Sequence, residues 1–296
     1  MRRLTISLDF ELGWGAIEDD LWRRREAAGV YERMRDDLLR FVNRLGELDL
    51  TLTWATVGAM IGPAGEANLH HLQGTFGEKA RGFADTARPE TQDGRDLVAI
   101  VRACRTPQHF GSHTYSHVRF DDPEQDDATI STELRLAREA CLAAGLEADA
   151  LVFPRNLVGH LDAVAGAGFG IVRLPASRPT SAVGRLPGPF GRAAVSLLSA
   201  PPAAARFDGP AGLRMETGTD MLNWGWSAGR IKRWATRRRI ASALAMAEAG
   251  GGDAHLWLHP FNLTETSGLM TYVDAVLDRI ARARDRRAVA VVPFTA

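Results

Sequence analysis

Residues 4–11 read LTISLDFE, an apolar segment of strand length that ends in two carboxylates, Asp9 and Glu11. Side chains two residues apart project to the same side of an extended strand, so both carboxylates would lie on one face. A single acidic residue at a strand end is usually a helix cap or a solvated charge, but two on an apolar strand favour a functional role. No glycine-rich G-x-G-x-x-G turn follows this strand, which favours an α/β barrel over a dinucleotide-binding sheet.

Short apolar segments alternate with amphipathic helical patterns along most of the remaining sequence. Apolar residues recur in the longer segments at the spacing of one helix face. Repeated alternation of this kind implies parallel strands with helices outside them, hence an α/β fold. Further strands are expected at residues 50–57, 109–112, 150–153, 170–174, 255–258 and 289–292, and helices at residues 31–48, 97–104, 128–144, 161–167, 231–249 and 269–283.

Two stretches interrupt this alternation. Residues 62–95 are polar and contain several glycines, and residues 175–212 are rich in Pro, Ala and Gly. We interpret both as long loop excursions over one end of the barrel, where loops that contact a substrate usually lie. Because neither stretch resembles an interdomain linker, residues 1–296 are expected to form a single domain.

Charge and cysteine content narrow the function classes. The 36 basic and 36 acidic residues cancel, so no global field attracts nucleic acid or an anionic membrane. The chain shows no apolar signal-peptide core and no run of 18 apolar residues, and Cys104 and Cys141 have no C-x-x-C spacing. We therefore expect a cytoplasmic protein with a small-molecule or glycan substrate, no nucleic-acid partner and no membrane span.

His113 and His117 are the main candidates for metal ligands. Residues 113–117 read HTYSH, and histidines at i and i+4 lie on the same side of one helical turn, close enough to bind one ion. This spacing also arises by chance, but here it directly follows a predicted strand, where barrel enzymes keep their ligands. Two imidazoles and one carboxylate suit Zn²⁺, Fe²⁺, Co²⁺, Mn²⁺ or Ni²⁺ and leave positions for water.

Two more predicted strands end in polar side chains. Residues 255–260 read HLWLHP, in which His259 ends the strand at the presumed active face and His255, at its start, is interpreted as structural. Residues 152–156 read VFPRN, so Arg155 and Asn156 follow another strand. Polar side chains thus converge from four strands on one end of the barrel, which predicts a catalytic site.

These motifs resemble those of the polysaccharide deacetylases of the NodB-homology type, carbohydrate esterase family 4. The H-[ST]-x-x-H motif of that family matches residues 113–117, its late Leu-His motif matches residues 258–259, and its second-strand ending resembles residues 55–58. Its opening acidic motif resembles residues 8–11, although Phe10 separates the two acids here, as in a divergent acid-x-acid branch. The resemblance covers about residues 4–292 and implies a distorted (β/α) barrel of about seven strands, the NodB-homology fold.

The resemblance also implies roles for individual residues. Glu11, His113 and His117 would hold the metal, with Zn²⁺ as the first candidate, and Asp9 would act as the general base. Either carboxylate is open as the ligand, and the longer side chain favours Glu11. His259 would act as the general acid, and Arg155, in an altered Arg-Pro motif, would orient the base.

Aromatic and amide side chains are expected to contact the substrate. Sugar rings stack well on indole, so Trp14, Trp224 and Trp226 would form an apolar wall, although each also fits a core position. Asn156 is expected to contact the substrate from the strand end beside Arg155. Residues 220–224 (DMLNW) have the D-x-x-x-W spacing of another family motif, or form an acidic loop beside a core tryptophan.

The expected function is metal-dependent hydrolysis of an N-acetyl or similar amide on an amino sugar or glycan-like substrate. Metal-bound water would attack the carbonyl, and the leaving amine would take a proton from His259. One alternative is a metal-independent amide or cyclic-imide hydrolase on the same fold, which would not need both His113 and His117. Another is a non-catalytic carbohydrate-binding relative, which would usually have lost a ligand or His259.

Overall fold

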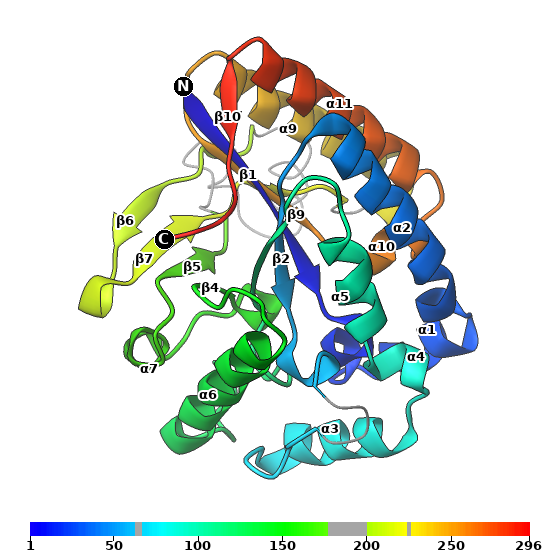
Figure 1. Ribbon diagram of the computed structural model, residues 1–296, viewed down its shortest axis with the longest axis vertical. Helices are drawn as coiled ribbons and strands as arrows, with labels where there is room; N and C mark the ends of the chain where they lie inside the picture. The colour runs from blue at the N-terminus through cyan, green and yellow to red at the C-terminus, as the bar shows by residue number, and fades with distance from the viewer. Residues whose placement is uncertain (63–66, 177–199, 224–225) are drawn as a thin grey trace.

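A computed structural model describes residues 1–296 except 63–66, 177–199 and 224–225. Its centre is a ten-stranded sheet. Nine strands follow the order β6-β7-β5-β4-β3-β2-β1-β9-β8, and the tenth, β10, pairs with β1. The sheet curls into part of a barrel (Figure 1). The strands are β1 (Arg2–Phe10), β2 (Thr53–Thr56), β3 (His109–Ser112), β4 (Ala150–Val152), β5 (Ile171–Leu174), β6 (Arg206–Asp208), β7 (Arg214–Thr217), β8 (Asp220–Met221), β9 (Ala254–Leu258) and β10 (Val289–Val291).

The α/β barrel class is confirmed, but the expected number of about seven strands is wrong. All strand pairs in the described part of the chain are parallel except β6 with β7. The additional strands β6, β7 and β8 are two to four residues long, and β6 lies within the Pro-, Ala- and Gly-rich stretch. Unlike the equally short β4 and β10, they are not runs of apolar residues, so no strand pattern is recognised in them.

Helices cover the outside of the sheet, and α2, α11 and α9 lie along one side of it (Figure 1). Phe41 of α2 packs edge-on against Trp54 of β2, which in turn packs against Phe10 of β1. The helices are α1 (Leu21–Ala27), α2 (Val30–Leu48), α3 (Gly74–Thr86), α4 (Pro89–Gln92), α5 (Arg95–Arg102), α6 (Asp127–Ala143), α7 (Leu161–Gly166), α9 (Arg230–Glu248), α10 (Phe261–Glu265) and α11 (Leu269–Asp285). No helix among the described residues has the length and apolarity needed to cross a bilayer.

The stretch 62–95 is not the long loop that we expected, because it contains α3 and α4. Helix α3 buries Phe76, Ala80 and Phe83, which lie on one helix face, and the ring of Phe83 packs edge-on against Trp14 and Trp22. Polar residues and glycines on the other face concealed this pattern. Of the stretch 175–212, residues 177–199 lie outside the described part of the chain, and the remainder contains β6.

The two faces of β1 differ in a way that positions the site. Leu4, Ile6, Leu8 and Phe10 belong to the main hydrophobic core. The alternate residues Thr5, Ser7 and Asp9 are buried and polar, and they point to the inside of the curled sheet. The inner face of β1 is therefore polar, and a small apolar cluster lies beside it inside the curled sheet, formed by Ala55, Ala150, Val152, Ile171 and Phe294.

Candidate active site

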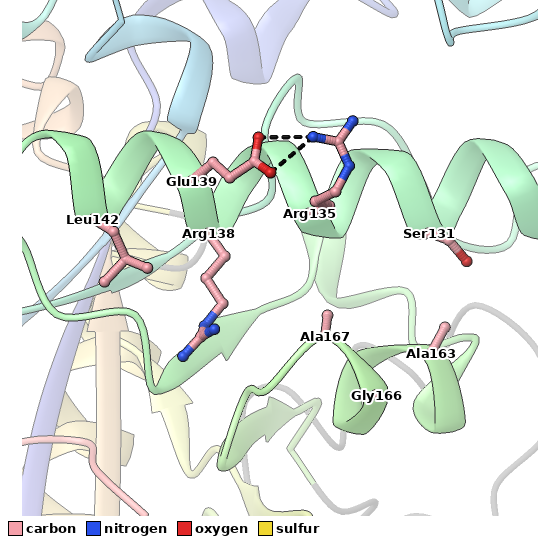
Figure 2. A pocket seen from close by; sticks show the side chains of 8 residues that line it. All are labelled: Ser131, Arg135, Arg138, Glu139, Leu142, Ala163, Gly166 and Ala167. Atoms are coloured by element: carbon pink, nitrogen blue, oxygen red, sulfur yellow. Dashed lines mark hydrogen bonds and ion pairs between the residues drawn. The ribbon is translucent and has the colours of Figure 1, made fainter.

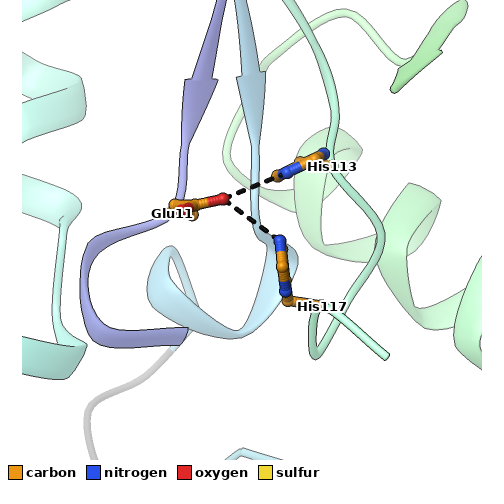
Figure 3. Close-up of side chains that lie close together, drawn as sticks. All are labelled: Glu11, His113 and His117. Atoms are coloured by element: carbon orange, nitrogen blue, oxygen red, sulfur yellow. Dashed lines mark hydrogen bonds and ion pairs between the residues drawn. The ribbon is translucent and has the colours of Figure 1, made fainter. Parts of the chain in front are cut away.

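Glu11, His113 and His117 form one compact group of buried side chains (Figure 3). Nε2 of His113 lies 3.2 Å from Glu11 Oε2, and Nε2 of His117 lies 3.1 Å from the same oxygen. The three ligand atoms lie within 4.8 Å of one another, which is the spacing of ligands around one metal ion. The structure therefore brings together the three residues that the sequence predicted as ligands.

The protonation of His113 supports a cation at this position. Nδ1 of His113 lies 2.8 Å from the carbonyl oxygen of Val152, which can only accept, so Nδ1 carries the proton. In the neutral ring, Nε2 then presents a lone pair to the Glu11 carboxylate, and two acceptors this close require a proton or a metal ion between them. Burial lowers the pKa of His113, but the Glu11 carboxylate and the charge of Asp9 outweigh it and raise the pKa above its ordinary value.

The other two members respond differently to burial. Burial raises the pKa of Glu11, but the charges of His259 and His117 and hydrogen bonds from both ligand histidines hold it well below its ordinary value. Burial dominates at His117 and lowers its pKa. A divalent transition ion requires a carboxylate anion and neutral imidazoles, so it would replace the proton that His113 otherwise shares with Glu11. The donor set thus fits such an ion.

The segment 113–117 is a loop, so the helical turn that we expected for it is wrong. Thr114 and His117 have φ values of 64° and 68°, in the left-handed region that ends a regular helix. The buried carboxylate of Glu133 on α6 replaces helical hydrogen bonds: its Oε1 accepts from the backbone N–H of Tyr115 at 2.8 Å and of Ser116 at 2.6 Å. The loop conformation, fixed from α6, brings the two imidazoles together.

Asp9 is held by an arginine that the sequence analysis did not identify. Nη1 of Arg173 donates to Asp9 Oδ1 at 2.7 Å and Nη2 donates to Oδ2 at 2.8 Å, and both side chains are buried. Nη1 also donates to Ser7 Oγ and Nη2 to Asn156 Oδ1. Burial raises the pKa of Asp9, but the Arg173 guanidinium outweighs it and keeps the pKa below its ordinary value.

A second buried layer lies behind Arg173. Ser7 Oγ lies 2.8 Å from Nε2 of His255, and Nδ1 of His255 lies 2.6 Å from Glu216 Oε1. Arg206 and Arg3 form ion pairs with the other oxygen of Glu216. His255 is thus structural, as predicted from its position at the strand start, but it is also connected through Ser7 to the guanidinium that holds Asp9.

His259 follows the last residue of β9 and faces both carboxylates. Its Nε2 lies 3.7 Å from Asp9 Oδ2 and 3.7 Å from Glu11 Oε1, and its side chain is 22% exposed. These distances are too long for direct hydrogen bonds, so the imidazole is available to a molecule in the adjacent cleft. Asp220, which the D-x-x-x-W spacing suggested as a family motif, forms an ion pair with Arg239 at 2.8 Å.

The cleft over these residues has a volume of about 600 Å³, large enough for a sugar-sized ligand. A second hollow of about 520 Å³ lies between α6 and α7 (Figure 2), but its lining contains none of the histidines or buried carboxylates described above. We therefore regard the first cleft as the candidate active site. It is lined by Asp9, Glu11, Gly15, His117, Arg155, Asn156, Pro175, Ala176, Asp220, Met221, Arg239, Trp257 and His259.

The structure corrects the prediction for Arg155. Its side chain lines the cleft but forms ion pairs with Glu18 at 2.6 Å and Asp19 at 3.2 Å, and Arg173 binds Asp9 in its place. Arg155 has a left-handed backbone (φ 53°), which lies inside the short 3-10 turn after β4. Asn156 lines the cleft, and its contact with a substrate stays a prediction.

Of the three tryptophans predicted to form an apolar wall, the two that the structure describes, Trp14 and Trp226, do not line the cleft. Trp14 is buried against Phe83, and its Nε1 donates to the carbonyl of Gln92, away from the cleft. Trp226 stacks on Tyr272 and does not line the cleft, and Trp224 lies outside the described residues. Among the described tryptophans, Trp257 lines the cleft, and its ring centre lies 5.2 Å from the Arg173 guanidinium carbon. Its alternation with His259 on β9 was the available signal.

No protein-family model and no curated protein matches this sequence. Among solved structures, a protein from Mycobacterium smegmatis assigned as a polysaccharide deacetylase is similar, with a TM-score of 0.55 and 14% identity over 99% of this chain and 93% of its own. The GH57-type branching enzyme from Pyrococcus horikoshii has a TM-score of 0.54 and 10% identity, over 99% of this chain and 69% of its own. For the 4-α-glucanotransferase from Thermococcus litoralis the TM-score is 0.51, with 8% identity over 99% and 39% of the two chains. The distorted barrel inferred from the motifs is thereby confirmed, and this chain has the fold of a polysaccharide deacetylase, a fold that it shares with enzymes named for glucan chemistry.

Proposed function

We propose that this protein is a metal-dependent hydrolase that removes an acetyl or similar acyl group from the nitrogen of an amino sugar or glycan-like substrate. Glu11, His113 and His117 would hold one divalent transition ion, with Zn²⁺ the first candidate. Such an ion, when bound, supplies a Lewis acid that lowers the pKa of water and polarises a carbonyl oxygen.

One observation carries this proposal. Nε2 of His113 and Nε2 of His117 both face the same oxygen of a buried carboxylate, while the other nitrogen of His113 is already occupied by a backbone carbonyl. A backbone carbonyl that accepts a hydrogen bond from the other ring nitrogen of a metal-binding histidine orients the ring in known metal sites. Gly15 also contributes, because a Cβ at that position would overlap the Glu11 carboxylate.

Asp9 would act as the proton acceptor in the cleft. Oδ2 is the oxygen that faces His259, and the attacking water would give up its proton there. Arg173 keeps Asp9 ionised and fixes both oxygens in one orientation. A low pKa makes Asp9 a weak base, which is adequate only for a water whose own pKa has been lowered.

His259 would supply the proton that the leaving amine needs. Expulsion of an amide nitrogen without protonation is prohibitive, and Nε2 of His259 is exposed to the cleft on the side of Asp9. Trp257 and Asn156 would contact the sugar, since an indole and an amide offer an apolar face and hydrogen bonds.

Cleavage of a glycosidic bond, which the names of two fold neighbours suggest, fits this site less well. That reaction uses two carboxyl groups that flank the bond, one as acid and the other as nucleophile or base. Here the Glu11 carboxylate faces two imidazoles, and both oxygens of Asp9 are bound by Arg173. That reaction needs one carboxyl group in its protonated form, and the pKa values of Asp9 and Glu11 are both held below their ordinary values.

Metal analysis and paired substrates test the proposal. Protein purified without chelator should contain about one divalent ion per chain and should release amine from N-acetyl amino sugars. His259→Ala should lower the rate on an amide by about 10²–10⁴ and the rate on an activated ester of the same acyl group much less. Its metal content should match that of the wild type. The ester needs no proton on its leaving group.

A second histidine variant provides the control. His109 is buried near the start of β3, where it contacts Thr53 and Asp149, so His109→Gln should retain metal while His113→Ala and His117→Ala lose it. A wild-type protein that remains metal-free after incubation with Zn²⁺, Co²⁺ and Mn²⁺ would favour the metal-independent hydrolase. An equal loss on amide and ester would reassign His259 to the metal or the oxyanion.

A further inference from the structure

The first half of α9 exposes two large apolar side chains within a basic surface. Ile231 is 70% exposed and Trp234 is 55% exposed, more than any other large apolar residue of the described chain except Met1. They lie three residues apart, on one face of the helix. The exposed basic residues around them are Arg230, Lys232, Arg233, Arg237 and Arg238.

This positive charge is local, although the whole chain has a net charge of zero. No acidic residue occurs between Asp220 and Glu248, and the same segment contains six basic residues. Arg233 Nε donates to the carbonyl of Trp226, and the Arg237 guanidinium lies over the rings of Trp226 and Tyr272. Two of the exposed cations are thus held in place by the protein. The global charge balance used in the sequence analysis conceals this segregation.

The hollow between α6 and α7 offers a comparison (Figure 2). It also presents an exposed leucine, Leu142 at 53%, beside arginines. There, however, Arg135 forms an ion pair with Glu139 at 2.7 Å, so an acidic residue neutralises the basic one. The first half of α9 differs from this hollow in its sequence, because its exposed apolar side chains stand among basic residues with no acidic residue before Glu248.

The α9 surface lies at the same end of the molecule as the cleft. Strand β8 runs parallel to β9, so its carboxyl end lies at the edge of the sheet where His259 follows β9. The chain passes from β8 through a short 3-10 turn (Trp226–Ala228) into α9, so α9 begins at this edge. Arg239, one turn beyond the exposed residues, lines the cleft itself.

We propose that the first half of α9 docks the protein on an anionic phospholipid surface. Ile231 and Trp234 would enter the boundary between headgroups and acyl chains, and the surrounding basic residues would bind lipid phosphates. Helices that lie in a membrane interface combine a Lys- and Arg-rich polar face with Trp and aliphatic residues. Docking at this helix would hold the cleft entrance beside the membrane. The inference does not depend on the reaction proposed above.

Lipid explains the surface better than nucleic acid does. Basic residues bind either polyanion, but nucleic acid offers no partner for an exposed isoleucine, whereas the acyl region of a bilayer does. Trp is the residue that most often anchors proteins at the membrane interface. Each basic residue near an anionic bilayer strengthens partitioning roughly fivefold, so five exposed cations suffice for measurable binding.

Vesicle cosedimentation of the full chain tests this proposal. The protein should bind vesicles of phosphatidylcholine with phosphatidylglycerol at least about tenfold more strongly than phosphatidylcholine alone, and high salt should weaken the binding. The pair Ile231→Ser and Trp234→Ser, and separately the pair Arg230→Gln and Lys232→Gln, should each reduce binding at least about tenfold. The control pair Leu142→Ser and Arg138→Gln on α6 should bind like the wild type.

The variants change exposed residues outside the cleft, so their circular dichroism and metal content should match those of the wild type. Equal binding to neutral and anionic vesicles, or full binding by both α9 variants, would overturn the proposal. Binding to a random-sequence RNA duplex without binding to vesicles would overturn it as well, in favour of a nucleic-acid surface. Because the readout is binding, a failure here leaves the amide-hydrolase proposal unaffected, and the reverse also holds.

Discussion

The metal-binding side chains and the proton acceptor are held by different parts of the chain. Glu11, His113 and His117 project from loops that directly follow β1 and β3, and a single carboxylate on α6 fixes the longer loop. Asp9 and Arg173 lie within strands, and the residues behind them are also in strands. We call Glu11, His113 and His117 the loop half of the site, and Asp9, Arg173 and the buried residues behind them the strand half. The loop half is fixed by one contact with a helix, whereas the strand half needs side chains from four strands.

This difference gives the two halves different sensitivities. A loop can adjust when one side chain is replaced, so we expect ligand variants to lose metal while the fold persists. The strand half is buried and charged, and removal of one partner leaves an uncompensated charge inside the sheet. We expect its variants to affect stability as well as activity.

The largest effect on rate should separate the two carboxylates. Asp9→Asn removes the proton acceptor but leaves a side chain of similar shape, so it should reduce turnover by about 10²–10⁴ and retain metal. Glu11→Gln should lose metal first, because an amide oxygen is a poorer ligand than a carboxylate. Measurements of metal content and of the rate of amine release for both variants test this difference. The opposite pattern would exchange the two roles, and equal mild effects would remove both residues from the site.

Arg173→Met should have the largest effect on stability. It leaves the Asp9 carboxylate buried without its cation, which typically costs about 3–5 kcal/mol in the free energy of unfolding. The double variant Asp9→Asn with Arg173→Met removes both charges and should recover most of that loss. Chemical denaturation of the metal-free proteins measures the unfolding free energy of each variant. A double variant as unstable as Arg173→Met would show that Arg173 stabilises the fold through Ser7 and Asn156 rather than through Asp9.

Asp220 should affect stability with a pH dependence opposite to that of Asp9 and Glu11, whose pKa values are lowered. Asp220 has one ion pair, with Arg239, and burial raises its pKa from 3.8 to about 6. The folded protein therefore holds this proton more tightly than the unfolded chain does. The associated stability is fully present below the unfolded pKa of 3.8 and is lost as the pH rises through about 6.

Asp220→Asn removes this titration. Relative to the variant, the wild type should lose up to about 3 kcal/mol of unfolding free energy between pH 4 and pH 7, since one pKa unit corresponds to about 1.4 kcal/mol. Denaturation curves of both proteins at several pH values measure the difference. Parallel pH profiles would mean that Arg239 keeps Asp220 ionised throughout.

The sequence predicted the loop half of the site well and the strand half poorly. Glu11, His113 and His117 follow apolar strand patterns, and the H-x-x-x-H spacing is local, so neighbouring residues carry the information. Arg173 lies 164 residues from Asp9, and nothing near either residue encodes their pairing. The position of Arg173 between Val172 and Leu174 could have indicated a buried anion, because an arginine inside an apolar strand needs a buried partner of opposite charge.

Part of the fold was missed for a related reason. Strands β6, β7 and β8 are short, and they are held in the sheet by pairing with distant strands more than by their own pattern. The helix α3 was missed because its exposed face is unusually polar and contains glycine. Periodicity predicts elements whose two faces differ clearly, and these elements do not meet that condition.

The smallest effect expected is that of Arg155→Gln, and it decides between the motif and the geometry. The family motif implies that Arg155 orients the base, and removal of a residue that orients a catalytic group should lower the rate by roughly one to two orders of magnitude. In the structure its side chain is 37% exposed and pairs with Glu18 and Asp19 on the rim, where ion pairs contribute about 0–1 kcal/mol.

We therefore expect Arg155→Gln to change kcat less than about threefold and unfolding free energy by less than about 1 kcal/mol. A rise in KM alone would indicate that Arg155 contacts the substrate in the cleft, which its position allows. Arg173→Lys is the matched comparison, since it keeps the charge but loses the two-pronged contact with Asp9. If Arg155→Gln lowered kcat as strongly as Arg173→Lys, the base would be oriented from both sides, and the strand half of the site would extend into the loop after β4.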